Sequence, residues 1–324
     1  MISISATYDN DYRNRRDDIY IMDDDGKNTR CLTVTSNLST YRKLHWLMDN
    51  KIILLASYTP TEQFYLISVE NGFIRPFMQK NEQKLIRKIT YDQKAFFSTH
   101  GHYWMVPING TIDDRVELVV KGMLVGVSSD GQWIAFYQEE TPDYVYVQKL
   151  NTSYMQQIPM SYIDQSEEHN GDPRTVVWSP DSRYLAYEAN YQELWVMRVD
   201  GTHRRKVGEL NYFWLQFRWS PDSTSIAFIG SVRADEGGGP AVAAAPLYVT
   251  RIDDPIPRYL AVLRREDDSG GMWDWMSDGE HLVYATHLAD EAKLYKINIR
   301  TGNQYLLTDS GHPFAAIYDV AVSS

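Results

Sequence analysis

The sequence predicts an all-β fold built from one repeated unit, and three observations lead to this prediction. Phe, Trp and Tyr make up 13% of the 324 residues, and Val and Ile are also frequent, a composition typical of strands. Long stretches with helical periodicity are hard to find. Two short sequence phrases also recur along the whole chain, about 40 to 50 residues from one copy to the next.

The first phrase consists of an aromatic residue, two small or polar residues, an Asp and a short apolar run. Its best copies are WSPDSRYLAY (178–187) and WSPDSTSIAF (219–228), followed closely by VSSDGQWIAF (127–136) and WMSDGEHLVY (275–284). WLMDNKIILL (46–55) and ITYDQKAFF (89–97) are more divergent. The Asp is present in every copy, as Asp49, Asp92, Asp130, Asp181, Asp222 and Asp278. Pro presets the first dihedral of a turn and Asp caps it, so each phrase predicts two strands joined by a tight turn.

The second phrase is an alternating apolar run that ends in a turn rich in Asp, Asn and Gly. Its seven aromatic positions are Tyr20, Tyr65, Trp104, Tyr146, Trp195, Tyr248 and Tyr295. The turns DDG, ENG, ING and VDG supply Gly where a tight hairpin requires a positive φ. The acidic segment DDDGKN (23–28) suggests calcium binding, but it lacks the further acidic ligands of a calcium loop, so we interpret it as a hairpin.

Together the two phrases predict a seven-bladed β-propeller of four-stranded antiparallel blades within a single domain. The tail IYDVAVSS (317–324) resembles the start of a first phrase and MISISATY resembles its continuation, so the C-terminal strand is expected to complete the N-terminal blade. Closing the fold in this way removes exposed sheet edges. The predicted blades are 1–35 with 315–324, 42–80, 85–120, 122–160, 173–210, 213–263 and 271–309.

Charge and composition exclude several classes of function. The 43 Asp and Glu residues outnumber the 32 Lys and Arg residues, and the net charge of −11 argues against a nucleic-acid partner. The single cysteine, Cys31, excludes an intrachain disulfide and a cysteine zinc cluster, and we expect it to be a small buried residue. The sequence has no run of 18 consecutive apolar residues, so we predict no membrane insertion. The N-terminus lacks the pattern of an export signal, which predicts a cytoplasmic protein unless a leader has been removed.

Three segments carry a resemblance to a known family. WSPDSRYLAY, ELWVMRVDGTHRRKV and DIYIMDDDGKNTRCLT resemble the repeats of TolB-type, WD-repeat-like propellers, and similar repeats occur in the N-terminal domains of tricorn and dipeptidyl-peptidase proteins. The resemblance covers nearly the whole chain. TolB has six blades and an extra N-terminal domain, whereas this sequence predicts seven blades and has no room for that domain.

Catalytic motifs are sparse. The peptidase relatives carry their nucleophile in a separate domain marked by G-x-S-x-G, and the nearest match here has Asp130 in place of the second Gly. His100 and His102 form the only close histidine pair. Some propeller lyases that act on uronates use a histidine-bearing metal centre, so this pair is a weak metal candidate, although two solvated imidazoles on a loop are favoured. We therefore predict no metal, no cofactor and no catalytic residue.

Irregular loops predict where a partner binds. In each blade the first-to-second and third-to-fourth turns are short, whereas the irregular segments 9–18, 36–43, 161–174, 230–246 and 264–272 fall on the opposite rim. Variable loops on a rigid scaffold are typical of a recognition surface. The predicted partner-binding residues are Tyr12, Arg13, Arg15, Arg16, Tyr41, Arg42, Tyr162, Asp235 and Glu236. Arg15 and Arg16 alternatively pair with Asp17 and Asp18 in solvent.

Four further residues precede the repeated aromatic position of the innermost strands and are candidates to line a central channel: His45, Lys88, Arg218 and Asp274. An ion pair between Arg218 and Asp274 is the alternative interpretation of that pair. The function predicted from the sequence is a non-catalytic propeller that binds a protein or peptide through its rim loops and channel mouth. The alternatives are a propeller-type polysaccharide lyase or hydrolase and an accessory module of a peptidase.

Overall fold

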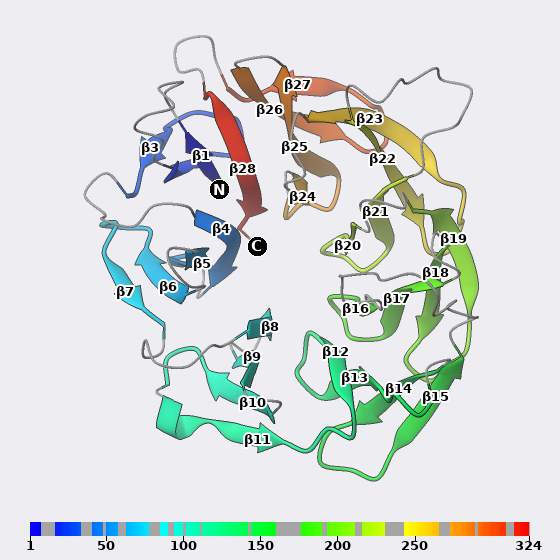
Figure 1. Ribbon diagram of the computed structural model, residues 1–324. Helices are drawn as coiled ribbons and strands as arrows, with labels where there is room; N and C mark the ends of the chain where they lie inside the picture. The colour runs from blue at the N-terminus through cyan, green and yellow to red at the C-terminus, as the bar shows by residue number, and fades with distance from the viewer. Residues whose placement is uncertain are drawn as a thin grey trace. The chain divides into compact units, whose positions relative to one another are not determined.

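In this computed structural model the strands of the described residues form seven four-stranded antiparallel sheets (Figure 1). The described residues are 1–7, 17–33, 41–47, 50–57, 63–77, 85–89, 94–99, 102–110, 112–141, 144–159, 176–189, 193–210, 216–230, 243–265, 273–288, 291–308 and 314–323. Within these ranges the only helical element is the 3-10 turn η1 (Ile112–Asp114). The predicted all-β class is confirmed.

The chain divides into two compact units, and three of the sheets lie in the first of them. In spatial order, the strands of one sheet are β28 (Ala316–Val322), β1 (Ile2–Thr7), β2 (Asp17–Met22) and β3 (Arg30–Cys31). The next sheet contains β4 (Tyr41–Leu47), β5 (Ile52–Ser57), β6 (Gln63–Ser68) and β7 (Ile74–Pro76). The third contains β24 (Trp273–Trp275), β25 (His281–Leu288), β26 (Glu291–Asn298) and β27 (Gln304–Leu306).

Three other sheets lie in the second unit. The first contains β8 (Leu85–Ile89), β9 (Lys94–Thr99), β10 (His102–Pro107) and β11 (Val116–Leu118). The second contains β12 (Met123–Val127), β13 (Trp133–Tyr137), β14 (Tyr144–Lys149) and β15 (Met155–Pro159). The third contains β16 (Val176–Trp178), β17 (Tyr184–Ala189), β18 (Glu193–Arg198) and β19 (Arg205–Glu209).

The remaining sheet contributes to both units. It contains β20 (Phe217–Trp219), β21 (Ser225–Ile229), β22 (Ala243–Arg251) and β23 (Arg258–Arg265). Strands β20 and β21 belong to the second unit, and β22 and β23 are divided between the two. In this sheet, as in the others, the first phrase of the sequence supplies the first two strands and the second phrase supplies the last two.

The C-terminal strand completes the sheet that begins at the N-terminus, as the sequence predicted. Strand β28 pairs antiparallel with β1, with Ile2 opposite Val322 and Ile4 opposite Val320. Figure 1 shows β28 beside β1. Ile2, Ile4, Ile317 and Val320 are all buried and belong to one hydrophobic cluster, so each contributes about 1.5–3 kcal/mol by leaving water.

Stacked aromatic pairs explain the recurring aromatic residue of the second phrase. Phe136 stacks on Tyr146 with ring centroids 5.4 Å apart, and Tyr284 stacks on Tyr295 at 5.5 Å. Each pair joins the second and third strands of one sheet in direct register. Such a pair adds about 0.5–1.5 kcal/mol beyond the area that it buries.

The hairpin glycines behave as predicted in three of the four turns. Gly26, Gly72 and Gly201 have positive φ values of 82°, 71° and 82°. A Cβ at Gly26 would also lie 2.2 Å from the carbonyl oxygen of Leu307, so this turn requires Gly on two grounds. The prediction is wrong for Gly110, which is not among the positive-φ glycines; its N–H donates to the Pro107 carbonyl in a turn that precedes η1.

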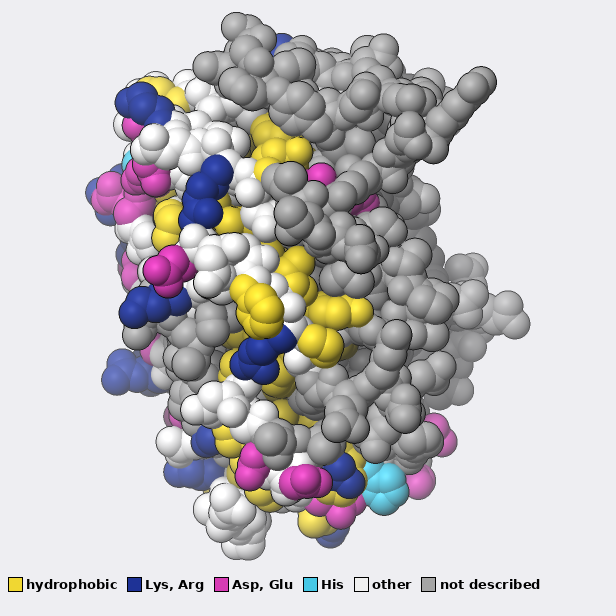
Figure 2. Space-filling model, turned by 90° about the vertical axis from the view of Figure 1, so that its left-hand side faces the viewer, with side chains coloured by type: hydrophobic (Ala, Val, Ile, Leu, Met, Phe, Trp, Pro, Cys, Tyr) yellow, Lys and Arg dark blue, Asp and Glu magenta, His cyan; other side chains and the backbone are white. Residues whose placement is uncertain are grey.

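The last strands of the three sheets in the first unit are short edge strands of two or three residues. Strand β7 has three residues and ends at Pro76, which cannot donate to another strand. Figure 2 shows the side of the molecule on which β3 and β7 lie, where apolar side chains are interspersed with charged ones. Cys31 lies in edge strand β3 and is partly exposed, so the prediction that it is buried is wrong. Among the described residues no helix is long and apolar enough to cross a membrane.

Candidate functional site

The Asp of the first phrase is a turn cap in every copy for which the structure describes the turn. Asp181 Oδ1 accepts hydrogen bonds from Ser179 Oγ at 2.6 Å and from the Arg183 N–H at 3.0 Å. Ser179 Oγ in turn accepts the Tyr184 N–H at 2.9 Å. Asp130 and Asp222 make the same bond to the Ser two positions earlier, at 2.5 Å in both cases. These carboxylates hold the hairpin together and are not free for chemistry.

The same turns are linked from sheet to sheet through serines in the left-handed conformation. Ser182 and Ser223 have φ values of 60° and 61°. Ser182 Oγ accepts the Asp130 N–H and Ser223 Oγ accepts the Asp181 N–H, each at 3.0 Å. The corresponding residue in the SSDG turn is Gly131, whose φ is 66°. Ser is therefore used, in place of the less strained Gly, where its hydroxyl binds the preceding sheet.

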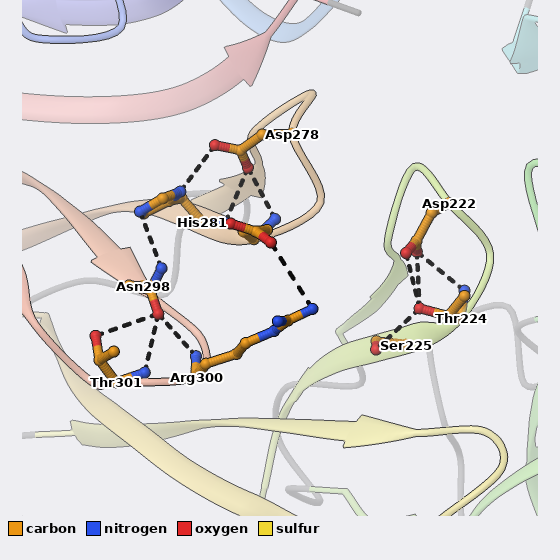
Figure 3. Close-up of polar contacts among 9 residues, drawn as sticks. Asp222, Thr224, Ser225, Asp278, His281, Asn298, Arg300 and Thr301 are labelled. Atoms are coloured by element: carbon orange, nitrogen blue, oxygen red, sulfur yellow. Dashed lines mark hydrogen bonds and ion pairs between the residues drawn. The ribbon is translucent and has the colours of Figure 1, made fainter.

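A different polar network stabilises the turn of the β24–β27 sheet (Figure 3). Asp278 Oδ1 accepts the His281 N–H at 3.0 Å, and Asp278 Oδ2 lies 2.8 Å from His281 Nδ1. Asn298 Oδ1 accepts three bonds, from the Arg300 and Thr301 N–H groups and the Thr301 hydroxyl. Its Nδ2 is therefore the group that faces His281 Nε2, at 3.2 Å.

This network has an Asp–His pair without a free base. The His281 Nε2 atom, which would accept a substrate proton in a catalytic dyad, already accepts the Asn298 amide. Burial raises the pKa of Asp278, but hydrogen bonds from the Glu280 N–H, the His281 ring and the His281 N–H outweigh it and leave that pKa below its ordinary value. Burial also raises the pKa of Asp222, and hydrogen bonds from Ser220 and Thr224 outweigh it, so that pKa is lowered too. Both carboxylates serve the turns.

The predicted partner-binding residues lie mostly outside the described residues. Tyr12, Arg13, Arg15, Arg16, Tyr162, Asp235 and Glu236 lie there, and Tyr41 and Arg42 are described only as backbone at the start of β4. Asp17 and Asp18 are the alternative ion-pair partners of Arg15 and Arg16. Asp18 accepts a hydrogen bond from Thr33 Oγ1 at 2.6 Å. The partner-binding rim therefore stays a prediction. Only the strands next to it, β1, β2 and β4, are described.

Two aspartates on first strands connect neighbouring sheets of the first unit. Asp274 Oδ2 accepts the Val322 N–H of β28 at 3.0 Å, and its Oδ1 accepts the Trp275 N–H at 2.9 Å. Asp319 Oδ2 accepts the Leu44 N–H of β4 at 2.8 Å, and its Oδ1 accepts the Val320 N–H at 2.9 Å. Each carboxylate thus bonds the backbone of its own strand and that of the next sheet. This contact gives the channel candidate Asp274 a structural role.

The other channel candidates occupy first strands as predicted. His45 is exposed in β4 and Arg218 is half-buried in β20. Lys88 lies in β8, where only its backbone is described. Their part in lining a channel stays a prediction.

The weak metal candidate His102 has a carboxylate partner instead. His102 lies in β10, the third strand of its sheet, and its Nδ1 is 2.7 Å from Glu117 Oε1 in edge strand β11. Both side chains are more than half exposed. His100 lies outside the described residues, and within the described part of the chain no group of three His, Cys, Asp or Glu residues could hold a metal ion.

Glu188 is a titratable group that the sequence analysis missed. It lies in β17 opposite Leu194, which is fully buried. Burial raises the pKa of Glu188 to about 7, and a carboxyl that titrates near neutral pH is a candidate for acid–base chemistry or for ligand binding. The sequence signal was faint: Glu188 follows the apolar run of a first phrase, where its neighbours Tyr187 and Ala189 are buried.

The sheets of this chain are similar to those of a solved TolB structure. TolB from Acinetobacter baumannii has 14% sequence identity and a TM-score of 0.52, and the match covers 98% of this chain and 65% of that chain. The fold is a TolB-like β-propeller. The chain spans about two thirds of the length of that TolB chain, and its seven sheets are the blades of the propeller fold. No protein-family model and no curated protein matches the sequence.

Enzymes share the same fold. Oligogalacturonate lyase in complex with manganese has 14% identity and a TM-score of 0.57 to this TolB-like propeller. Oligogalacturonate lyase from Vibrio parahaemolyticus has 13% identity and a TM-score of 0.59. Each match covers 94% of this chain and 84% of the other. At these identities the likeness shows the fold and not an activity.

Proposed function

We propose that this TolB-like propeller is a binding scaffold that recognises a protein or peptide partner at one rim of its first two blades. The rim residues are Tyr12, Arg13, Arg15 and Arg16, between β1 and β2, together with Tyr41 and Arg42 at the start of β4. The observation that supports the proposal is the register between β28 and β4, because it sets the start of β4 near the strand ends that flank residues 8–16.

Two hydrogen bonds define that register. Asp319 Oδ2 accepts the Leu44 N–H, and the Ala321 carbonyl accepts the Trp46 Nε1–H, and both contacts join residues 275 positions apart. Continuing this spacing along the two strands sets Tyr41 level with Ala316. Figure 1 shows β4 beside β28.

The base of the other segment lies at the same level. Ala316 pairs with Thr7, and Thr7 pairs with Asp17. Thr7 and Asp17 flank the connection that contains Tyr12, Arg13, Arg15 and Arg16. The register therefore supports a single site to which β4 and this connection both contribute.

The chemistry of the rim suits a protein partner. Tyr and Arg are enriched in the residues that dominate binding energy at protein interfaces, and the net charge of −11 disfavours a nucleic acid. The hydrogen bond from the Leu44 N–H to Asp319 ties β28 to β4, so the strands that flank the two segments form a rigid base, which lowers the entropic cost of binding.

A matched pair of variants tests the proposal. In the rim variant Arg13, Arg15, Arg16 and Tyr41 are changed to Ala. In the control variant Lys27, Lys51, Arg75 and Tyr305, which are exposed outside the rim, are changed to Ala. Partners captured from a lysate of the source organism by immobilised wild-type protein are identified, purified and titrated calorimetrically.

We expect the rim variant to bind the purified partner at least about tenfold more weakly, since its four side chains belong to the residue types of interface hot spots. The control variant should bind like the wild type. Equal affinity of the rim variant and the wild type for that partner would refute the proposal.

A further inference from the structure

A group of basic side chains lies in the hairpin between β18 and β19. This basic hairpin consists of Arg198, His203, Arg204 and Arg205 together with Arg183 from the neighbouring turn of the same sheet. The two turns are in contact, because the Val199 N–H donates to the Arg183 carbonyl at 2.9 Å. Five cationic or titratable basic side chains thus gather on a protein whose net charge is −11.

These side chains differ from other surface cations in having little compensation from carboxylates. Lys27 is bound by Asp25 at 2.8 Å and Arg251 by Asp253 at 2.7 Å. Within the described part of the chain, by contrast, Arg198, Arg204 and Arg205 have no carboxylate within ion-pair distance. Arg183 is only 4.0 Å from Asp181, with 80% of its side chain exposed.

Aromatic rings hold two of these arginines in place. The Arg204 guanidinium lies 5.0 Å from the ring centre of Trp195 and 5.9 Å from that of Tyr187. The Arg198 guanidinium lies 5.9 Å from the ring centre of Tyr184. Cation–π contact fixes a guanidinium without neutralising its charge and leaves its N–H donors able to bind an anion.

One buried polar atom at this site also lacks a partner. The Arg205 Nε has no hydrogen bond in the described structure, whereas the buried Tyr187 hydroxyl interacts with Arg204. A buried polar group without a partner costs free energy. The site therefore has hydrogen-bonding capacity that its own chain does not use.

The nearby carboxylates are already engaged. Asp200 accepts both the N–H and the hydroxyl of Thr202, at 2.9 and 2.6 Å. Glu193 and Glu209 share Lys206, whose Nζ lies 2.8 and 3.1 Å from them. Asp200 still attracts Arg198 and His203 through space, but none of these acids forms an ion pair with Arg198, Arg204 or Arg205 in the described part of the chain.

We infer that the basic hairpin is the docking site for an acidic segment of a partner protein. Arg204, the residue before β19, lies against the Trp195 ring on one face of the sheet, and Arg205, the first residue of β19, belongs to the opposite face. An extended chain laid along edge strand β19 can therefore meet guanidinium groups from both faces, and each guanidinium can hold a carboxylate through two N–H donors. Strand β19 is the edge strand of its sheet, and a polypeptide can pair its backbone with such an edge whereas a nucleic acid cannot, so an acidic peptide is favoured over a nucleic acid.

A labelled peptide of twelve alternating Asp and Glu residues is the probe, and binding is followed by fluorescence anisotropy at 50 and 200 mM salt. The test variant carries Arg198→Gln, Arg204→Gln and Arg205→Gln. The control variant carries Lys51→Gln, Arg75→Gln and Lys121→Gln, which removes the same charge from exposed residues elsewhere. Arg204→Lys keeps the charge but removes the planar fork, and a single-stranded oligonucleotide of twelve nucleotides is the competing anion.

We expect the test variant to bind the acidic peptide at least about tenfold more weakly than the wild type, and the control to change by less than about threefold. Arg204→Lys should lie between the two. No binding of the acidic peptide by the wild type, equal losses in both triple variants, or tighter binding of the oligonucleotide would overturn the inference. The rim variant of the proposed function retains the basic hairpin, so its result decides the two proposals separately.

Discussion

Replacing Asp319 by Asn should weaken the junction between the first two blades. The Asp319 carboxylate accepts the Leu44 N–H at 2.8 Å and the Val320 N–H at 2.9 Å, and the residue is only 8% exposed. A hydrogen bond to a charged acceptor contributes about 1.5–3 kcal/mol. Asn retains one acceptor, but its NH₂ group then faces a backbone N–H. We therefore expect the free energy of unfolding to fall by about 2–4 kcal/mol, a large share of the roughly 5–15 kcal/mol of a typical protein.

Urea unfolding followed by tryptophan fluorescence measures this loss. With a slope of about 3 kcal/mol per molar urea, the midpoint should fall by about 1 M. The control is Asp253→Asn, which removes a carboxylate bound to Arg251 at 2.7 Å but 64% exposed, and should cost less than about 1 kcal/mol. Equal midpoints for the two variants would refute the argument that Asp319 joins the blades.

Three other substitutions give distinct outcomes in the same unfolding assay. Ser223→Ala should cost about 1.5–3 kcal/mol, because it loses the hydrogen bond from the Asp181 N–H and places Ala at a positive φ. Ser223→Gly loses the same bond but relieves the backbone strain, so it should cost less than about 1 kcal/mol. Equal costs would contradict this. Gly26→Ala should destabilise by about 3 kcal/mol and Gly201→Ala by about 1 kcal/mol, since a Cβ meets a backbone carbonyl in the first case and a movable side chain in the second; the reverse order would be evidence against the turn geometry. The pKa of Glu188 in the folded state is raised from 4.5 to about 7, so the free energy of unfolding of the wild type should fall as the pH rises through that window. Glu188→Gln should be more stable than the wild type by about 1–2 kcal/mol at pH 8 but not at pH 4. A gain independent of pH would exclude this explanation.

Local features of the fold could be predicted from the sequence because they depend on local chemistry. The turn around Asp181 combines a Ser and an Asp two positions apart, and its hydrogen bonds lie within the same short segment. The role of β28 was also predictable, because a repeated pattern shows which strand is missing. Gly110 was predicted wrongly because the ING turn leads into η1 instead of closing a tight hairpin.

Contacts between sheets could not be predicted, since they join residues far apart in the chain. Nothing near Asp274 indicates that its carboxylate binds Val322, 48 positions away. The raised pKa of Glu188 likewise depends on what covers it. The basic hairpin had a sequence signal, the run from His203 to Lys206, but only the structure shows that Lys206 is paired and Arg204 is held by rings.

Trapping the C-terminal strand against the N-terminal strand tests whether β28 completes the first blade. Ser3 and Ala321 are paired in register, and antiparallel partners have Cα atoms about 4.5–5.5 Å apart, within disulfide range. In a Cys31→Ser background, the pair Ser3→Cys and Ala321→Cys should form an intramolecular disulfide in the folded protein, detected by mass spectrometry, and raise the thermal midpoint. The pair Ser3→Cys and Val322→Cys, shifted by one residue, should form it poorly. A disulfide that forms equally in both pairs, or only after unfolding in urea, would contradict the claim that β28 completes the first blade.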